Sequence, residues 1–382
     1  MRTSVAPVQI PVTKPFLGEE EERAVVEVLR SGWVVQGPRV AEFERSVADY
    51  VGAAHAVATS SCTTALHLAL RLLEIGPGHE VILPSFTFIA TANAVRYVGA
   101  MPVFADIDPR SYNLDPDGVE AAVTPRTRAI LAVHQIGLAA DMDRIQSVAE
   151  RHGLAVLEDA APSLGATYRG RRVGGLENVT CFSFHPRKVI TTGEGGMLTL
   201  QDAGLADRAR RLRAHGMSVS DLARHRAGRV VIEDYPEVGY NYRMSDLHAA
   251  VGIEQMKRLP ALLARRREQA ERYNRAFADL PAVQLPLSLP SAPHTYQSYL
   301  LQLLPEARKS RDQVMAEMLE AGVATRPSVM AVHLTPPYRG SSRALPITER
   351  VSRNGILLPL YHTMTDAEHA YVIEQLRQVL GA

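Results

Sequence analysis

The chain has 382 residues, of which 46% are hydrophobic and 22% are charged, and its formal net charge is +1. This composition is ordinary for a soluble globular protein, and the length suits a large domain with a smaller one. The near-neutral charge argues against nucleic-acid binding, which needs a concentrated basic surface. Two cysteines, Cys62 and Cys181, are too few for a disulfide framework, and no metal-ligand spacing includes them.

The first residues, MRTSVAPVQIPVTKPF, lack a positive segment followed by an apolar run, so we expect no signal peptide. No stretch approaches the ~18 uninterrupted apolar residues that a membrane-spanning helix needs. We therefore expect a cytoplasmic enzyme that has no membrane partner.

The N-terminal part is predicted to be helical. In 18–31 (GEEEERAVVEVLRS) acidic residues crowd the first turn, where they favour the positive end of a helix dipole, and Gly32 follows. Amphipathic patterns predict two further helices, over about 38–51 and 62–74.

The next part of the chain alternates between short apolar runs and helical patterns. The apolar runs predict strands buried on both faces of a parallel sheet. They cover residues 80–84, 102–107, 128–134, 154–160 and 180–184. The helices predicted between them cover residues 87–99, 115–123 and 142–153. This alternation predicts an α/β fold with a mostly parallel central sheet flanked by helices, in which ligands bind at the carboxyl ends of the strands.

The pattern changes again near residue 246. A long helix interrupted at Pro260 is predicted first, followed by a proline-rich stretch over 281–293. A strand over 295–304 and two helices, over 311–322 and 366–381, complete a smaller α+β domain. We therefore predict two domains, residues 1–245 and 246–382.

Lys188 is the strongest candidate for a catalytic residue. It is one of only four lysines, and it lies between the end of a predicted strand and the glycine-rich turn 193–196. Glycines let a backbone turn sharply and approach a ligand closely. A lysine that is partly desolvated near other cations has a depressed pKa and can attack a cofactor aldehyde. Taken alone, the segment fits a surface lysine in a β-hairpin equally well.

Three other segments are candidates for cofactor contacts. Asp159 ends a buried strand, where an acid could keep the pyridine ring of pyridoxal 5′-phosphate (PLP) protonated or simply cap a helix. The stretch 60–64 (SSCTT) precedes a helix and could bind a phosphate, although serine and threonine are also ordinary helix caps. Phe88 could stack on a flat cofactor or pack in the core. The segment 238–244 (VGYNYRM) could be an interface or a site loop.

In this order the motifs resemble the DegT/DnrJ/EryC1/StrS family of sugar aminotransferases, which are fold type I PLP enzymes. The resemblance covers nearly the whole chain and includes GPGHEVILPSFTFIATANAV, EDAAPSLGATYRGRRVGG, SFHPRKVITTGEGGM and VGYNYRMSDLHAAVG. It implies transfer of an amino group from glutamate or glutamine to a nucleotide-linked keto-sugar. The pathway implied is the biosynthesis of amino sugars, antibiotics or polysaccharides. An inosose-type cyclitol ketone is an alternative acceptor. A PLP-dependent sugar dehydratase and a non-catalytic regulator are further alternatives.

The resemblance also implies roles for individual residues. Lys188 would carry the cofactor as a Schiff base, Asp159 would pair with the pyridine nitrogen, and Phe88 would stack on the ring. The residues implied to hold the phosphate are Ser61, Cys62, Thr63 and Ser183. Asn241 would reach the phosphate of the neighbouring subunit, which implies a homodimer with two shared sites.

Four places depart from the commonest family pattern. Pro162 stands where many members have a glutamine that bonds the phenolic oxygen of the cofactor, and it offers neither a donor nor a side-chain acceptor. Cys62 replaces a glycine, and Ile136 stands where tyrosine is frequent. The segment 325–338 (TRPSVMAVHLTPPY) lacks a His-Tyr pair. These differences concern cofactor tuning and the acceptor, and none removes the lysine or the acid.

Overall fold

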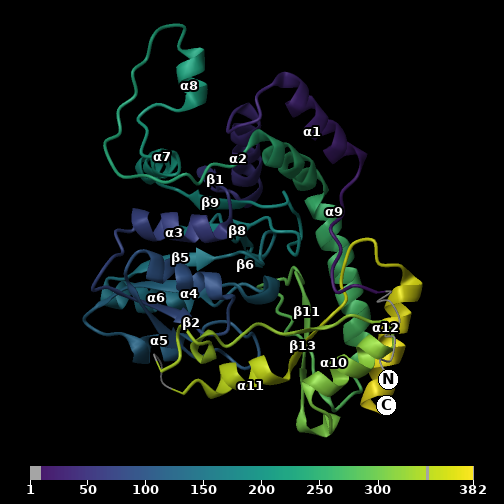
Figure 1. Ribbon diagram of the computed structural model, residues 1–382. Coiled ribbons are helices and arrows are strands. Elements are labelled where there is room, and N and C mark those ends of the chain that lie inside the picture. Colours follow the sequence, from purple (N-terminus) through teal and green to yellow (C-terminus); the bar gives the residue numbers. More distant parts are fainter. Residues whose placement is uncertain (1–9, 341–343, 382) are drawn as a thin grey trace.

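The computed structural model describes residues 10–340 and 344–381, and its centre is a seven-stranded sheet with the order β1-β9-β8-β5-β4-β2-β3 (Figure 1). The strands are His55–Thr59 (β1), Glu80–Pro84 (β2), Met101–Ala105 (β3), Thr127–Val133 (β4), Ala155–Asp159 (β5), Val179–Ser183 (β8) and Gly196–Leu200 (β9). Only β9 runs antiparallel to its neighbours in this sheet. The predicted α/β fold with a mostly parallel central sheet is confirmed.

Helices cover both faces of this sheet, because neighbouring residues of each strand point to opposite sides. Val57 packs in the core under α3, whereas Ala56 and Ala58 pack in the core under α2. One face carries Pro38–Val51 (α2), Pro116–Ala122 (α5) and Met142–His152 (α6). The other carries Cys62–Leu72 (α3), Ile89–Tyr97 (α4) and Ala203–Leu212 (α7). Five of these helices agree with the sequence pattern to within a few residues at each end, whereas α7 was not predicted.

The sequence pattern missed β1, the strand at one edge of the sheet. Its five residues, HAVAT, follow closely on the end of α2 at Gly52 and precede α3 at Cys62. Val57 is its only large apolar residue, so β1 lacks the continuous apolar run by which the other strands of the same length were predicted. Two short strands, Thr167–Tyr168 (β6) and Arg171–Arg172 (β7), form a separate hairpin after β5.

A second, antiparallel sheet with the order β10-β11-β13-β12 forms the lower part of Figure 1. Its strands are Val283–Gln284 (β10), Tyr299–Leu303 (β11), Arg326–Pro327 (β12) and Gly355–Leu358 (β13). The helices after α9 are Arg311–Glu320 (α10), Pro346–Asn354 (α11) and Asp366–Leu380 (α12). The core of this part joins Val314 of α10, Leu301 of β11 and Leu376 of α12. The predicted strand over 295–304 and the two predicted helices are therefore present.

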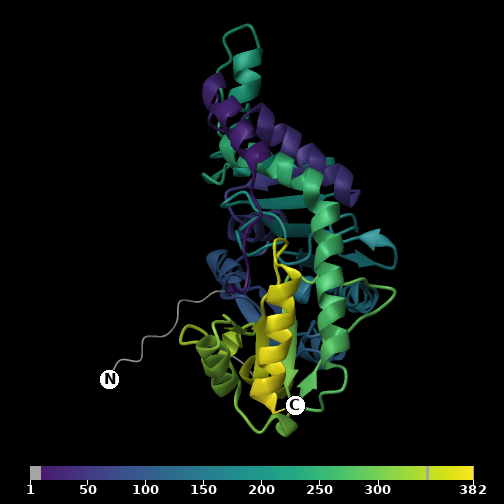
Figure 2. The same ribbon diagram turned by 90° about the vertical axis from the view of Figure 1, so that its right-hand side faces the viewer.

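The predicted interruption at Pro260 is wrong, because α9 is one helix from Asp246 to Phe277. A proline inside a helix removes one backbone hydrogen bond and tends to bend the helix, and α9 changes direction along its length in Figures 1 and 2. Burial compensates, because Leu259 packs in the core of the large sheet and Phe277 in that of the small one. Since α9 shares both cores, the predicted boundary after residue 245 stays a prediction.

Two helices lie outside these layers. Glu19–Ser31 (α1) packs against α9, and Asp221–Arg226 (α8) lies in a long excursion that extends away from the body of the molecule (Figure 2). Within residues 10–340 and 344–381, no helix is long and apolar enough to cross a membrane.

Candidate active site

A cavity of about 570 Å³ lies beside two segments that follow strands of the large sheet, one after β2 and one after β8. Lys188, in the connection from β8 to β9, and Phe88, at the start of α4, both line it. The opposite wall comes from 324–330 and from residues of β13, which belong to the second sheet. The cavity therefore lies where the large sheet faces the small one.

Lys188 is half-buried at this cavity. Burial lowers the pKa of its amine, the neighbouring Arg187 charge lowers it further, and Cys62 and Asp159 oppose the shift. A lower pKa leaves more of the amine neutral and nucleophilic. The alternative from the sequence was a surface lysine in a β-hairpin. β8 and β9 do pair as antiparallel neighbours, but Lys188, in their connection, lines a cavity instead of projecting from an open surface.

Asp159 is buried at the end of β5, with 4% of its surface exposed. Its carboxylate accepts hydrogen bonds from Thr91 Oγ1 at 2.8 Å and from the Ala161 amide at 3.0 Å. Burial raises the pKa of this carboxyl, whereas the two donors and the Lys188 charge act to lower it. No helix begins after β5 that Asp159 could cap, since residues 160–166 form turns. Thr91 carries no signal in the sequence, because only the fold brings α4 against β5.

A second buried pair, not foreseen from the sequence, supports the end of β5. The Ala140 amide donates to His134 Nδ1 at 3.0 Å, so Nε2 carries the proton that is shared with Glu158 Oε2 at 2.7 Å. Asn178 donates to the other oxygen of Glu158 at 2.9 Å. The His134 amide in turn donates to the Asp159 carbonyl at 3.1 Å. This network holds the backbone on which Asp159 sits.

The predicted phosphate residues come together around Gly196. This glycine pairs with Ser183 of β8 on one side and with Thr59 of β1 on the other. A Cβ added to it would lie 2.3 Å from the Ser61 carbonyl carbon and 2.6 Å from the Cys62 amide nitrogen, so only glycine allows this approach. Ser183 and the start of α3 are therefore neighbours.

The start of α3 leaves backbone donors available. Ser61 is the N-cap, and its hydroxyl accepts from the Thr64 amide at 3.2 Å. No hydrogen bond joins the Cys62 or Thr63 amide to another residue of the described chain. Unpaired N–H groups at a helix N-terminus form an anion site. Burial raises the pKa of the Cys62 thiol well above its ordinary value, so this cysteine remains neutral at the turn.

Of the predicted site residues, only Lys188 and Phe88 line the Lys188 cavity itself, and Asn241 also lies on the outer surface. It is exposed, it forms an antiparallel bridge with Ala214, and it does not line the Lys188 cavity. Its neighbour Tyr242 accepts a hydrogen bond from the Ser60 amide at 2.8 Å. Asn241 is thus beside the phosphate turn of its own chain, but it faces solvent.

The departures from the family pattern fall at different distances from the cavity. Pro162 lies outside the lining, whereas Arg326 and other residues of 325–330 line it. Ile136 is buried in a 3-10 turn at φ 59°, which is unusual for a β-branched residue, and its carbonyl accepts from the Gln297 amide at 3.1 Å. The C-terminal change therefore touches the cavity directly, and Arg326 is a cavity residue that the sequence alone did not single out.

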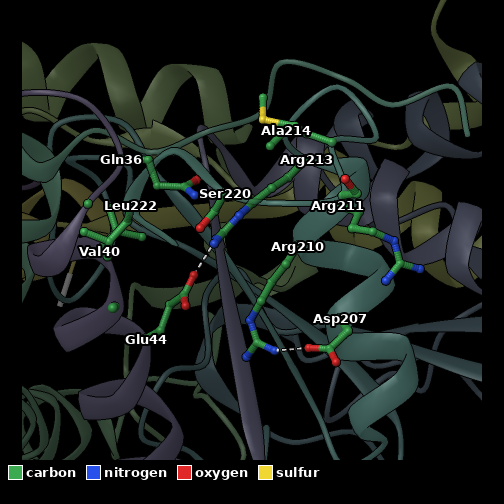
Figure 3. A pocket seen from close by; sticks show the side chains of 14 residues that line it. Gln36, Val40, Glu44, Asp207, Arg210, Arg211, Arg213, Ala214, Ser220 and Leu222 are labelled. Carbon is green, nitrogen blue, oxygen red and sulfur yellow. Dashed lines mark hydrogen bonds and ion pairs between the residues drawn. The ribbon is translucent and has the colours of Figure 1, made fainter. Parts of the chain in front are cut away.

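A second cavity, of about 400 Å³, lies at the free edge of β1 between α2 and α7 (Figure 3). None of the predicted site residues lines it. Arg213 and Glu44 form an ion pair there, with Arg213 donating to the Ala58 carbonyl at 2.7 Å and Glu44 accepting from the Ala58 amide at 2.9 Å. The pair satisfies the outward-facing groups of the edge strand. Among the described residues, no cluster of histidine, cysteine or acidic side chains could hold a metal ion at either cavity.

The profile of the DegT/DnrJ/EryC1/StrS aminotransferase family matches residues 15–377. The chain belongs to the DegT/DnrJ/EryC1/StrS aminotransferase family. The predicted family is confirmed, and the chain is an aminotransferase.

Similar proteins from this family cover almost all of the chain. The spore coat polysaccharide biosynthesis protein SpsC of Bacillus subtilis is 42% identical over 380 residues, which are 97% of each protein. The GDP-perosamine synthase of Caulobacter vibrioides is 42% identical over 375 residues, 97% of this chain and 98% of that enzyme. Among solved structures, the PLP form of Spr1654 from Streptococcus pneumoniae is 30% identical and superposes with a TM-score of 0.90, covering 97% and 98% of the two chains.

Proposed function

We propose that this aminotransferase uses PLP carried on Lys188 to move an amino group from glutamate or glutamine to a nucleotide-linked keto-sugar. The observation that carries the proposal is the half-buried Lys188 amine, which lines a cavity close to the buried Asp159. The similarity to a GDP-perosamine synthase and to a protein solved in its PLP form supports the sugar acceptor and the cofactor.

The residues present fit PLP. Asp159 is a buried carboxylate of the kind that pairs with a protonated pyridine nitrogen. The start of α3, with Ser61, Cys62 and Thr63, and the adjacent Ser183 offer unpaired amides and hydroxyls for a phosphate. The ring of Phe88 is 63% exposed at the cavity, which is unusual for a large apolar side chain and suits stacking on a flat ring.

The bound cofactor would supply an electron sink for a carbanion at the substrate carbon. In this proposal, the Lys188 amine would remove a proton from the donor α-carbon in the first half-reaction and would deliver a proton to the acceptor carbon in the second, which a neutral amine of lowered pKa can do. The Asp159 carboxylate keeps a proton on the ring nitrogen, and Thr91 and the Ala161 amide fix its orientation. The apolar wall from 329–330 and β13 limits the access of water.

The alternatives differ in their chemistry. A sugar dehydratase of this family typically lacks the lysine, and here Lys188 is present. A non-catalytic regulator would not need a lysine of lowered pKa at a cavity. An inosose-type cyclitol ketone is the second candidate acceptor.

The active unit in this proposal is a homodimer in which Asn241 completes the partner's phosphate site. Supporting this, the excursion that contains α8 exposes Val230, Ile232 and Val238 by 90%, 89% and 84%. Apolar side chains this exposed indicate a surface that another chain covers. Coexpression of the Lys188→Ala and Asn241→Ala variants tests it, because the mixed dimer would contain one site with both residues intact. Activity well above that of either variant is expected, and the absence of complementation would contradict sharing.

The absorbance spectrum of the purified protein with PLP tests the cofactor and the donor together. A visible band that glutamate or glutamine bleaches, and that a keto-sugar nucleotide restores, is the expected result. A protein that takes up no PLP would overturn the proposed function. A panel of nucleotide keto-sugars and inososes, compared by restoration of the band, separates the two acceptor classes.

A further inference from the structure

The cavity at Lys188 is strongly biased in charge. Its lining contains three cations, Arg187, Lys188 and Arg326, and none of the described lining residues is acidic. Apolar side chains make up much of the remaining wall, including Val12, Met330, and Leu357 and Leu358 of β13. A cavity with cations and no counter-charge attracts anions.

Both arginines lack partners for their guanidinium groups. No ion pair or hydrogen bond joins either guanidinium to another residue within 10–340 and 344–381. Arg187 and Arg326 line the same cavity, and the pKa of Arg326 is lowered by burial and by the charge of Arg187, so the two cations repel each other. An anion bound between them would remove this repulsion and gain charge-assisted hydrogen bonds.

The main chain around each arginine is held in place although the side chains are free. The Arg187 carbonyl accepts a hydrogen bond from Gln297 Nε2 at 2.7 Å. Arg326 lies in β12, where it pairs with Leu357 of β13. One arginine thus comes from the connection between β8 and β9 of the large sheet and the other from β12 of the small sheet, so a ligand between them would bridge the two parts.

We propose that Arg187 and Arg326 bind the diphosphate of the nucleotide-linked acceptor, beside the Lys188 amine. Two guanidiniums match a group that carries two negative charges, and their planar forks suit phosphate oxygens. A neutral cyclitol would leave both cations unpaired. This inference rests on the proposed function and sharpens it, because it favours a phosphate-bearing acceptor over an inosose.

Calorimetric titration of the PLP-loaded enzyme with nucleoside diphosphates tests the assignment. The probes are UDP, GDP and dTDP, and the matched nucleosides uridine, guanosine and thymidine serve as ligands without phosphate. At least one diphosphate is expected to bind, and Arg326→Gln should weaken it by about tenfold or more, the usual loss for a hydrogen-bonded charge. Arg326→Lys keeps the charge without the fork and should recover only part of the affinity.

Arg187→Gln should weaken the same diphosphate, and Arg275→Gln is the matched control. Arg275 is an exposed arginine in the last turn of α9, outside the cavity, so its substitution should leave diphosphate affinity unchanged. Bleaching of the visible band by glutamate is followed in every variant. The loss of diphosphate affinity should clearly exceed any change in the bleaching rate.

Several outcomes would overturn the assignment. They are no binding of any diphosphate to the unchanged enzyme, equal binding by Arg326→Gln, and nucleosides that bind as tightly as their diphosphates. A bleaching rate that falls as far as diphosphate affinity would instead assign the arginines to the donor carboxylate. In each case, bleaching of the unchanged enzyme by glutamate would leave the proposed function standing. A band that neither donor bleaches would remove that function itself.

Discussion

The two arginine-lined cavities differ in what their arginines contact. At the edge of β1, Arg213 is paired with Glu44 and Arg210 with Asp207, the latter at 2.9 Å (Figure 3). At the Lys188 cavity, neither Arg187 nor Arg326 has an acidic partner among the described residues. A buried arginine whose hydrogen bonds are made within the chain is part of the fold, whereas an unpaired arginine beside a candidate nucleophile is available to a ligand. Substitutions should therefore affect stability at one cavity and binding or catalysis at the other.

The largest effect is expected from Lys188→Ala. Loss of the amine should slow the glutamate-driven bleaching by about 10³-fold or more, since it removes both the covalent attachment and the proton transfer. Stopped-flow absorbance measures it, and added methylamine should restore part of the rate. Lys257→Ala is the control, because Lys257 is an exposed lysine that pairs with Glu254. A Lys188→Ala enzyme as fast as the control would contradict the assignment.

At the other cavity, Arg213→Ala should destabilise the fold. It leaves the nearly buried Glu44 carboxylate without its cation and the Ala58 carbonyl without its donor. Removing one partner of a buried pair costs about 3–5 kcal/mol. Urea unfolding measures the free energy, and Arg210→Ala, which breaks an exposed pair, should cost at most about 1 kcal/mol. A similar loss of unfolding free energy in the two variants would contradict the structural role of Arg213.

Arg187→Gln tests whether this unpaired cation acts on the lysine. The Arg187 charge helps to lower the pKa of the Lys188 amine, so its removal should raise that pKa toward the ordinary value. PLP uptake by the apoenzyme needs the neutral amine. The pH profile of uptake should therefore rise below the ordinary lysine pKa of 10.5 in the unchanged enzyme and move to higher pH in the variant. An unmoved profile, or a shift to lower pH, would contradict the coupling.

The smallest effect is expected on the stability of Arg326→Gln. The Arg326 side chain has no hydrogen-bond or ion-pair partner among the described residues and is repelled by Arg187, so urea unfolding should differ from that of the unchanged enzyme by no more than about 0.5 kcal/mol. If the same variant loses diphosphate affinity while its stability is unchanged, Arg326 serves ligand binding, in contrast to Arg213, which serves the fold. A loss of stability as large as that of Arg213→Ala would mean that Arg326 is a structural residue.

Much of the fold could be predicted because its signals are local. Apolar runs bounded by turns located the strands β2, β3, β4, β5 and β8, and helical periodicity located α4, α5 and α6. The errors occurred where tertiary packing decides. β1 has only one large apolar residue and therefore no continuous apolar run, and α9 continues through Pro260 because its side chains are buried in both cores.

For the candidate site, too, the sequence could predict the residues with a local signal and not those that only tertiary packing brings together. Lys188, Asp159 and the turn at Ser61 each stand at the end of an element, so the sequence alone could single them out, with the family resemblance supplying their roles. Thr91 and Arg326 could not be found this way, because each acts on a residue far away in the chain. The same holds for the pairing of arginines. Arg213 pairs with an acid, whereas Arg326 has no acidic partner in the part of the chain that the structure describes. This difference is a property of three-dimensional packing, since charge pairing depends on distance in space and not on separation along the chain.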